Sequence, residues 1–172
     1  MKNITQKIII TDTNIITDLN TANILDKFVS LSNVYISDMA KNDEINSDTG
    51  NVNIINKFKT ISATTEQIIE IFQISEEIKG LSRYDIINYI IARDNNAILA
   101  TGDQKLKTFS ERNGIEVIRT LKIMQLMVLN GNISKNEAIN GCILLKKNTS
   151  TRIPEIDIEN FINELKKDKV NN

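Results

Sequence analysis

Short apolar runs alternate along this chain with longer segments whose apolar residues recur at helical spacing. Runs at residues 8–10, 34–36 and 97–100 carry no polar interruption, which is typical of strands buried on both faces of a parallel sheet. The segments at residues 14–31 and 82–91 each have one apolar helical face. Strands that alternate with helices imply parallel crossovers. The pattern therefore predicts an α/β fold, a three-layer α/β/α sandwich with a mainly parallel central sheet.

The last part of the chain follows a purely helical pattern. Ser134-x-x-Glu137 is a capping box, and it begins a helix that runs through Leu145. An extended break at residues 152–154 contains the single proline of the chain and precedes a final amphipathic helix. We therefore expect a sheet domain over residues 1–131 and a C-terminal helical hairpin, residues 132–172, packed on the same domain.

Composition narrows the chemistry that this chain can perform. The 172 residues include no histidine, which excludes Ser-His-Asp triads, histidine general bases and histidine-ligated zinc. The single cysteine, Cys142, excludes an internal disulfide, and no apolar run reaches membrane-spanning length, so we expect a cytoplasmic protein. A net charge of −1 provides no global basic field, so a nucleic-acid partner would be held locally or through a metal. Any catalysis must rest on carboxylates.

Acidic residues stand where predicted strands end and where the following helices begin. They are Asp12, the doublet Asp43 and Glu44, Asp85 and Asp103. All strands of a parallel sheet open on the same edge, so Asp12 and Asp103 are expected to project the same way. Each acid also has an ordinary explanation. Asp12 and Asp103 suit helix N-caps, Asp85 suits the first turn of a helix, and the doublet suits a solvated helix face.

Several carboxylates gathered without a matching basic cluster repel one another, and a divalent cation would neutralise them. Mg²⁺ and Mn²⁺ take oxygen ligands, bind one or two carboxylates directly and leave the other positions to water and phosphate oxygens. Such a site can activate water for phosphodiester cleavage. Four basic residues near the predicted edge could contact phosphate, although any single one is better explained as an ordinary solvated charge. They are Lys41, Arg83, Lys105 and Lys107.

The motifs over about residues 7–130 resemble those of PIN-domain ribonucleases, of the kind found as VapC-type toxins in bacterial toxin–antitoxin pairs. The resemblance rests on Ile-Ile-Thr-Asp12-Thr-Asn14, Val-Tyr-Ile-Ser-Asp38, Leu81-Ser-x-x-Asp85 and Leu-Ala-Thr101-Gly-Asp103-x-x-Leu106. It implies a metal-dependent endoribonuclease that hydrolyses RNA phosphodiester bonds with Mg²⁺ or Mn²⁺. It also implies an RNA substrate and a cognate antitoxin protein as partner.

The resemblance assigns roles to individual residues. Catalytic acids would be Asp12, Asp43 or Glu44, Asp85 and Asp103, and the metal ligands would be Asp12, Asp85, Asp103 and Glu44. Asn14 and Thr101 would support them as polar groups that orient the carboxylates. The second acid of the family is usually a Glu followed by Leu or Ile, which fits Glu44-Ile45, whereas gapless counting from Ser37 points nearer to Asp43. Both stay candidates.

Two other functions fit parts of the pattern. A non-catalytic PIN-like module could bind RNA or a protein, although binding alone gives no reason for four repelling carboxylates. A phosphoryl-accepting receiver domain fits less well, because such domains place the phosphorylated Asp at a later strand and need a lysine near the end. The apolar segment at residues 121–129 is either a core helix or a contact with an antitoxin or with a second copy in a homodimer. We expect Phe161, Ile162 and Leu165 to dock on their own domain.

Overall fold

A single parallel sheet forms the centre of the molecule. The computed structural model describes residues 7–42 and 56–167. In these residues five strands pair in the order β3-β2-β1-β4-β5, and every pairing is parallel. The strands are β1 (Ile9–Thr11), β2 (Val34–Ser37), β3 (Lys59–Ile61), β4 (Ile98–Ala100) and β5 (Val117–Ile118). The predicted parallel sheet is confirmed.

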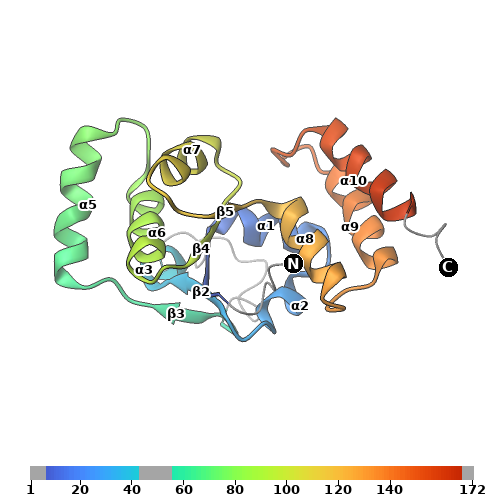
Figure 1. The fold of residues 1–172 in the computed structure, drawn as a ribbon, viewed down its shortest axis with the longest axis horizontal. Coiled ribbons are helices and arrows are strands. Elements are labelled where there is room, and N and C mark those ends of the chain that lie inside the picture. Colours follow the sequence, from blue (N-terminus) through green and yellow to red (C-terminus); the bar gives the residue numbers. More distant parts are fainter. Residues whose placement is uncertain (1–6, 43–55, 168–172) are drawn as a thin grey trace.

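The two faces of the sheet bury different side chains, because successive residues of a strand point to opposite sides. Ile9, Ile36 and Ile98 join one apolar cluster, whereas Ile10 and Leu99 join the other. The first cluster is covered by α1 (Thr13–Thr21), α2 (Leu25–Val29) and α8 (Thr120–Leu129). The second is covered by α6 (Arg83–Asp94) and α7 (Gln104–Arg112), with α5 (Thr65–Glu77) packed outside α6 (Figure 1). The three-layer α/β/α sandwich is confirmed.

Side chains determine where several helices begin. A complete capping box, with reciprocal side-chain and backbone hydrogen bonds, precedes α5, α6 and α9 (Lys135–Lys147). The boxes pair Thr64 with Gln67, Ser82 with Asp85, and Ser134 with Glu137. The short helix α3 (Asp38–Ala40) is capped by the hydroxyl of Ser37, which accepts from the N–H of Ala40 at 3.2 Å.

The single helix predicted for residues 14–31 is wrong, because two helices, α1 and α2, occupy this segment. Asn23 separates them with a left-handed φ of 56°, a conformation that asparagine tolerates better than most residues. The N–H of Ile24 bonds to the carbonyl of Leu19 at 3.0 Å, and the N–H of Asn23 bonds to that of Asn20 at 2.9 Å. This pair of bonds is a Schellman motif. The apolar spacing does not reveal the break between α1 and α2, because both helices bury their apolar residues in the same cluster.

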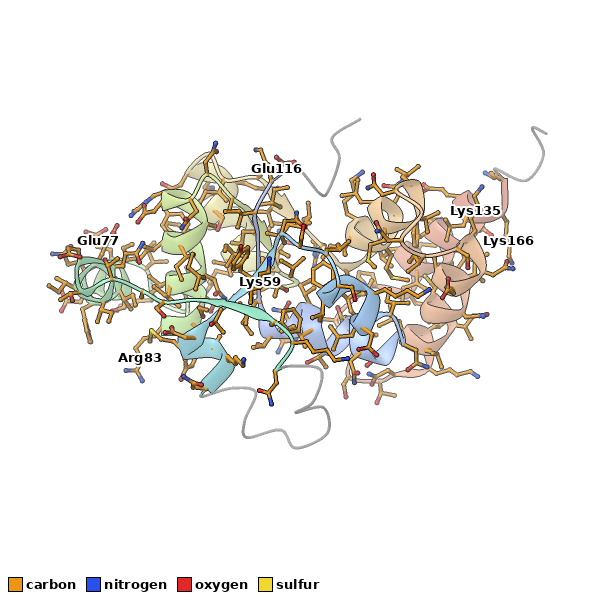
Figure 2. The ribbon with its side chains drawn as sticks, turned by 90° about the horizontal axis from the view of Figure 1, so that it is seen from below. Lys59, Glu77, Arg83, Glu116, Lys135 and Lys166 are labelled. Atoms are coloured by element: carbon orange, nitrogen blue, oxygen red, sulfur yellow. The ribbon has the colours of Figure 1, made fainter. Side chains whose placement is uncertain are left out.

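The C-terminal hairpin, α9 and α10 (Glu155–Lys167), packs on the α1 and α8 side of the sheet. Phe161 and Leu165 are buried in the same apolar cluster as the sheet residues, so their predicted docking is confirmed. An ion pair between Lys27 and Glu137 joins α2 to α9. Figure 2 shows the hairpin, marked by Lys135 and Lys166, at the opposite end of the molecule from Glu77 of α5. The boundary between residues 131 and 132 stays a prediction.

The helix α8 lies in the hydrophobic core, the first of the two explanations for its apolar sequence. Ile123, Met124 and Met127 are fully buried, whereas Leu129 at the end of the helix is 56% exposed. A contact of α8 with a second copy or another protein stays a prediction. None of the helices in the described ranges has the length and apolar character that crossing a bilayer requires.

We expect Gly141→Val to destabilise the hairpin docking. A Cβ at Gly141 would lie 3.0 Å from Cβ of Ala22 and 3.1 Å from its carbonyl oxygen, so α9 could not keep its approach to the end of α1. Overpacking of this kind costs about 1–3 kcal/mol of unfolding free energy. Asn140→Val introduces the same β-branched side chain on the exposed neighbour and should change stability by about 0.5 kcal/mol or less. Equal losses in urea denaturation would contradict the close packing.

Candidate functional site

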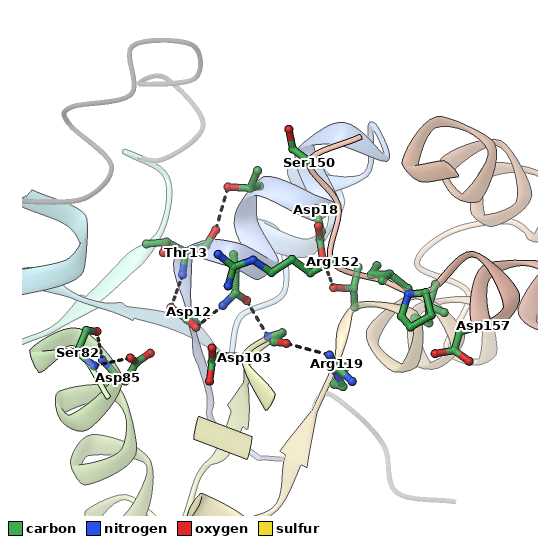
Figure 3. A pocket seen from close by; sticks show the side chains of 17 residues that line it. Asp12, Thr13, Asp18, Ser82, Asp85, Asp103, Arg119, Ser150, Arg152 and Asp157 are labelled. Carbon is green, nitrogen blue, oxygen red and sulfur yellow. Dashed lines mark hydrogen bonds between the residues drawn. The ribbon is translucent and has the colours of Figure 1, made fainter. Parts of the chain in front are cut away.

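A cavity of about 650 Å³ opens at the carboxyl edge of the sheet, where ligands bind in open α/β folds. One side is built from the residues that follow β1 and β4 and from the start of α6. The other side is built from the residues that follow β5 and from the loop that precedes α10. Its charged lining residues are Asp12, Asp18, Asp85, Asp103, Arg119, Arg152 and Asp157 (Figure 3).

Asp12 is a carboxylate at the end of the central strand and is only 4% exposed. Its Oδ1 accepts from the N–H of Thr13 at 2.8 Å, which caps α1. Its Oδ2 accepts from Nδ2 of Asn14 at 2.6 Å and from Oγ1 of Thr101 at 2.8 Å. Burying a charge requires such partners, because water no longer solvates it. These donors fix the carboxylate in one orientation.

Asn14 and Thr101 connect Asp12 to the loop that follows β4. Oδ1 of Asn14 accepts from the N–H of Gly102 at 2.7 Å. The hydroxyl of Thr101, which is fully buried, also accepts from the N–H of Asp103 at 3.1 Å. The two polar side chains that the resemblance named as supporting residues therefore lie against the Asp12 carboxylate, although their role in catalysis stays a prediction.

Asp85 and Asp103 each cap a helix and also line the cavity. Oδ1 of Asp103 accepts from the N–H of Leu106 at 2.8 Å, and Oδ2 of Asp85 accepts from the N–H of Ser82 at 2.7 Å. The second oxygen of each carboxylate has no hydrogen-bond partner within the described residues. The ordinary explanations, an N-cap for Asp103 and a first-turn position for Asp85, are therefore correct, but they leave an oxygen on each carboxylate for a ligand.

The structure brings Asp12, Asp85 and Asp103 to one cavity but does not gather them into one tight cluster. Within residues 7–42 and 56–167, no three acidic or cysteine side chains lie close enough to hold one metal ion together. Asp43 and Glu44 lie outside the described residues. The donor set still fits a hard cation, because Mg²⁺ binds through oxygen and takes only one or two protein carboxylates directly.

The basic residues of the cavity differ from those that the sequence suggested. Lys41, Arg83, Lys105 and Lys107 are not among the described lining residues, and Lys107 pairs with Glu111 on α7. Arg119 and Arg152 line the cavity instead. Arg119 directly follows β5, at the same edge as the acids, so its place after a short apolar run was a usable signal. Arg152 lies in a loop far along the chain, and nothing local indicates its place.

Asp18 is an acid of the cavity lining that the sequence analysis missed. It lies on α1, and burial raises the pKa of its carboxyl group, while hydrogen bonds from Thr120 and Thr151 and the charge of Arg119 act in the opposite direction. The hydroxyl of Thr120 donates to Oδ2 of Asp18 at 2.6 Å. Asp18 therefore joins α1, the start of α8 and the loop before α10 at the wall of the cavity.

Comparison with known proteins agrees with this geometry. A model of the PIN domain family matches residues 8–167, nearly the whole chain. The chain belongs to the PIN domain family. PIN domains are generally nucleases, so the family supports a hydrolase that acts on nucleic acid.

A solved structure has the same fold as this PIN domain. The crystal structure of PAE2754 from Pyrobaculum aerophilum superimposes with a TM-score of 0.53 at 17% sequence identity, covering 73% of this chain and 98% of that one. At this identity the likeness concerns the fold alone. The search of curated proteins found no match.

We expect Thr101→Val to lower the free energy of unfolding by about 1–3 kcal/mol, because a buried carboxylate loses a donor and the N–H of Asp103 loses its acceptor. Thr11→Val is the matched control. Thr11 is equally buried, yet its hydroxyl makes only a long bond, 3.4 Å to the carbonyl of Asp12, so we expect a loss below about 1 kcal/mol. Urea denaturation of both variants measures the difference, and equal losses would contradict the role of Thr101.

Proposed function

We propose that this PIN domain is a metal-dependent endoribonuclease that hydrolyses RNA phosphodiester bonds. The observation that carries the proposal is the convergence of Asp12, Asp85 and Asp103, from three separate parts of the chain, on one cavity at the carboxyl edge of the sheet. The absence of histidine from the sequence leaves carboxylates as the groups available for this chemistry. Membership of the PIN family supports the same class of reaction.

The side chains of the site have distinct tasks in this proposal. Asp12, Asp85, Asp103 and Glu44 would hold Mg²⁺ or Mn²⁺, with Asp43 as the alternative to Glu44 for the second acid. A bound ion of this kind lowers the pKa of a bound water and neutralises charge on the phosphate. Asn14 and Thr101 keep Asp12 in one orientation through bonds of 2.6 Å and 2.8 Å, so its carboxylate does not need to reorganise when a ligand arrives.

A non-catalytic PIN-like module that binds RNA or a protein is the second candidate. The observation in its favour is that the acids serve as helix caps, which explains Asp12, Asp85 and Asp103 without any metal. Capping does not explain why all three lie on one cavity, nor why one oxygen of both Asp85 and Asp103 has no hydrogen-bond partner among the described residues. We therefore favour the nuclease, and the experiment below separates the two candidates.

We also propose that the protein is the toxin of a type II toxin–antitoxin pair in the cytoplasm, with an antitoxin protein as partner and a homodimer as the assembled form. This rests on the resemblance of the motifs at Asp12, Asp85 and Asp103 to VapC-type toxins. Co-expression with the product of the adjacent gene tests it. Growth arrest that this product relieves, together with a stable complex of the two chains, is the expected result. Absence of both would contradict the proposed pairing.

We expect Asp12→Asn and Asp103→Asn to abolish saturable Mn²⁺ binding in calorimetry and to lower RNA cleavage by more than about 100-fold. This exceeds the 10–100-fold loss typical of residues that only support a metal ligand. Asparagine is as good an N-cap as aspartate, so both variants should keep α1 and α7 folded. At Asp12 the amide nitrogen also replaces the oxygen that accepts from Asn14 and Thr101, so this variant should lose some unfolding free energy as well as the charge.

The control is Asp26→Asn, which removes a carboxylate from α2 at an exposed ion pair with Lys57, away from the cavity lining. It should bind Mn²⁺ and cleave RNA as the unchanged protein does. Cleavage that survives Asp12→Asn would overturn the proposed nuclease. Absence of any divalent-ion binding by the unchanged protein would favour the non-catalytic module.

A further inference from the structure

The loop between α9 and α10 is held at the cavity from two sides. Nδ2 of Asn148 donates to the hydroxyl of Thr21 at 3.2 Å, and the side chain of Thr151 lies beside the carboxyl group of Asp18 and acts to lower its pKa. Ile153, on the other side of Arg152, packs against the main apolar cluster. The backbone around Arg152 is therefore positioned by α1, the same helix that Asp12 caps.

The side chain of Arg152 is directed across the cavity. Figure 3 shows it extending from the loop toward Thr13 and Asp12, whereas Asp157 lies at the opposite end of the cavity from its guanidinium. Within the described residues Arg152 makes no hydrogen bond and no ion pair. Arg119 differs, because its guanidinium already donates to the carbonyl of Gly102 at 2.9 Å and to Oε1 of Gln104 at 3.4 Å.

This arrangement calls for an anion between the guanidinium and the acids. An arginine that merely solvates the surface would gain nothing from a loop fixed on both sides. An arginine that plugs the site would pair with the acids, and Arg152 forms no such pair with a described acid. A planar guanidinium with free donors matches phosphate oxygens in a bidentate geometry. A strand with successive phosphates can present one phosphate to the acids and their cation and the next to Arg152.

We propose that Arg152 is a substrate-binding residue that donates to a phosphate of the RNA strand next to the scissile one. The C-terminal hairpin thereby completes the nuclease site that the sheet edge begins. The inference rests on the proposed function, and it adds a residue from outside the acidic motifs. It assigns RNA binding, and not the chemical step, to this side chain.

Salt dependence of binding tests the contact. A fluorescently labelled single-stranded oligoribonucleotide is titrated onto Asp12→Asn protein, which should not cleave it, over a series of salt concentrations. Loss of one phosphate contact on a single strand reduces the slope of log K against log salt by about 0.7. We expect Arg152→Ala to show this reduction and to bind about 10-fold more weakly. Arg152→Lys should keep the slope, because the positive charge stays. It should lose part of the affinity, because an ammonium group cannot donate two parallel hydrogen bonds as the planar guanidinium does.

Lys166→Ala is the matched control. It removes one positive charge from the same hairpin, at the end of α10 that lies away from the cavity loop, and should leave both slope and affinity unchanged. Cleavage kinetics at saturating Mn²⁺ provide a second measurement. Arg152→Ala should raise KM about 10-fold with kcat unchanged, the signature of lost uniform binding. Its thermal unfolding midpoint should match that of the unchanged protein, since the side chain is exposed.

Each other outcome overturns the inference. Equal salt slopes for Arg152→Ala and its parent would mean that Arg152 makes no phosphate contact. An equal reduction of the slope in Lys166→Ala would mean that the hairpin attracts RNA only through its overall positive charge. Tighter Mn²⁺ binding or faster cleavage in Arg152→Ala means that the arginine blocks the site. Failure of the proposed function is separate and is seen in the unchanged protein, which then cleaves no RNA with either metal.

Discussion

The buried carboxylate of Asp12 is the constraint around which the site is arranged. A charge that is 4% exposed needs a full set of donors, and these come from the start of α1 and from the end of β4. Meeting that need joins neighbouring strands at their carboxyl ends and fixes the first turn of α1. Because the hydroxyl of Thr101 also accepts from the N–H of Asp103, the same bonds position the next acid. The arrangement of residues at the carboxyl edge of the sheet thus follows from the need of the Asp12 carboxylate for hydrogen-bond donors.

In this PIN domain the same acidic side chains cap helices and line the cavity. Asp12, Asp85 and Asp103 each satisfy backbone N–H groups at the first turn of a helix, where the helix dipole also favours negative charge. The dipoles of α1, α6 and α7 therefore offset part of the cost of holding three like charges at one cavity. A substitution that keeps the cap while removing the charge separates the two tasks, and asparagine does this.

The C-terminal hairpin belongs to the architecture of the cavity as well as to the core. Buried residues of α9 and α10 continue the apolar cluster of α1 and α8, so the loop between the two helices has little freedom to move away. That loop carries Arg152, and its residue Thr151 lies beside Asp18 of α1. Arg119, which follows β5, and Arg152, from the hairpin loop, are therefore two guanidinium groups that line the same cavity as the acids.

Much of the fold and part of the site were determined by the sequence itself. Apolar runs, the capping box at Ser134 and polar residues directly after strands are local signals. They predicted the parallel sheet, the start of α9 and the acids Asp12 and Asp103. The sequence did not predict the helix break at Asn23, because Leu19 and Phe28 are buried in one cluster and keep helical apolar spacing across both helices. Only the tertiary structure brought Asp85 to the edge and Arg152 to the cavity, because both depend on how distant helices pack, which no local pattern encodes.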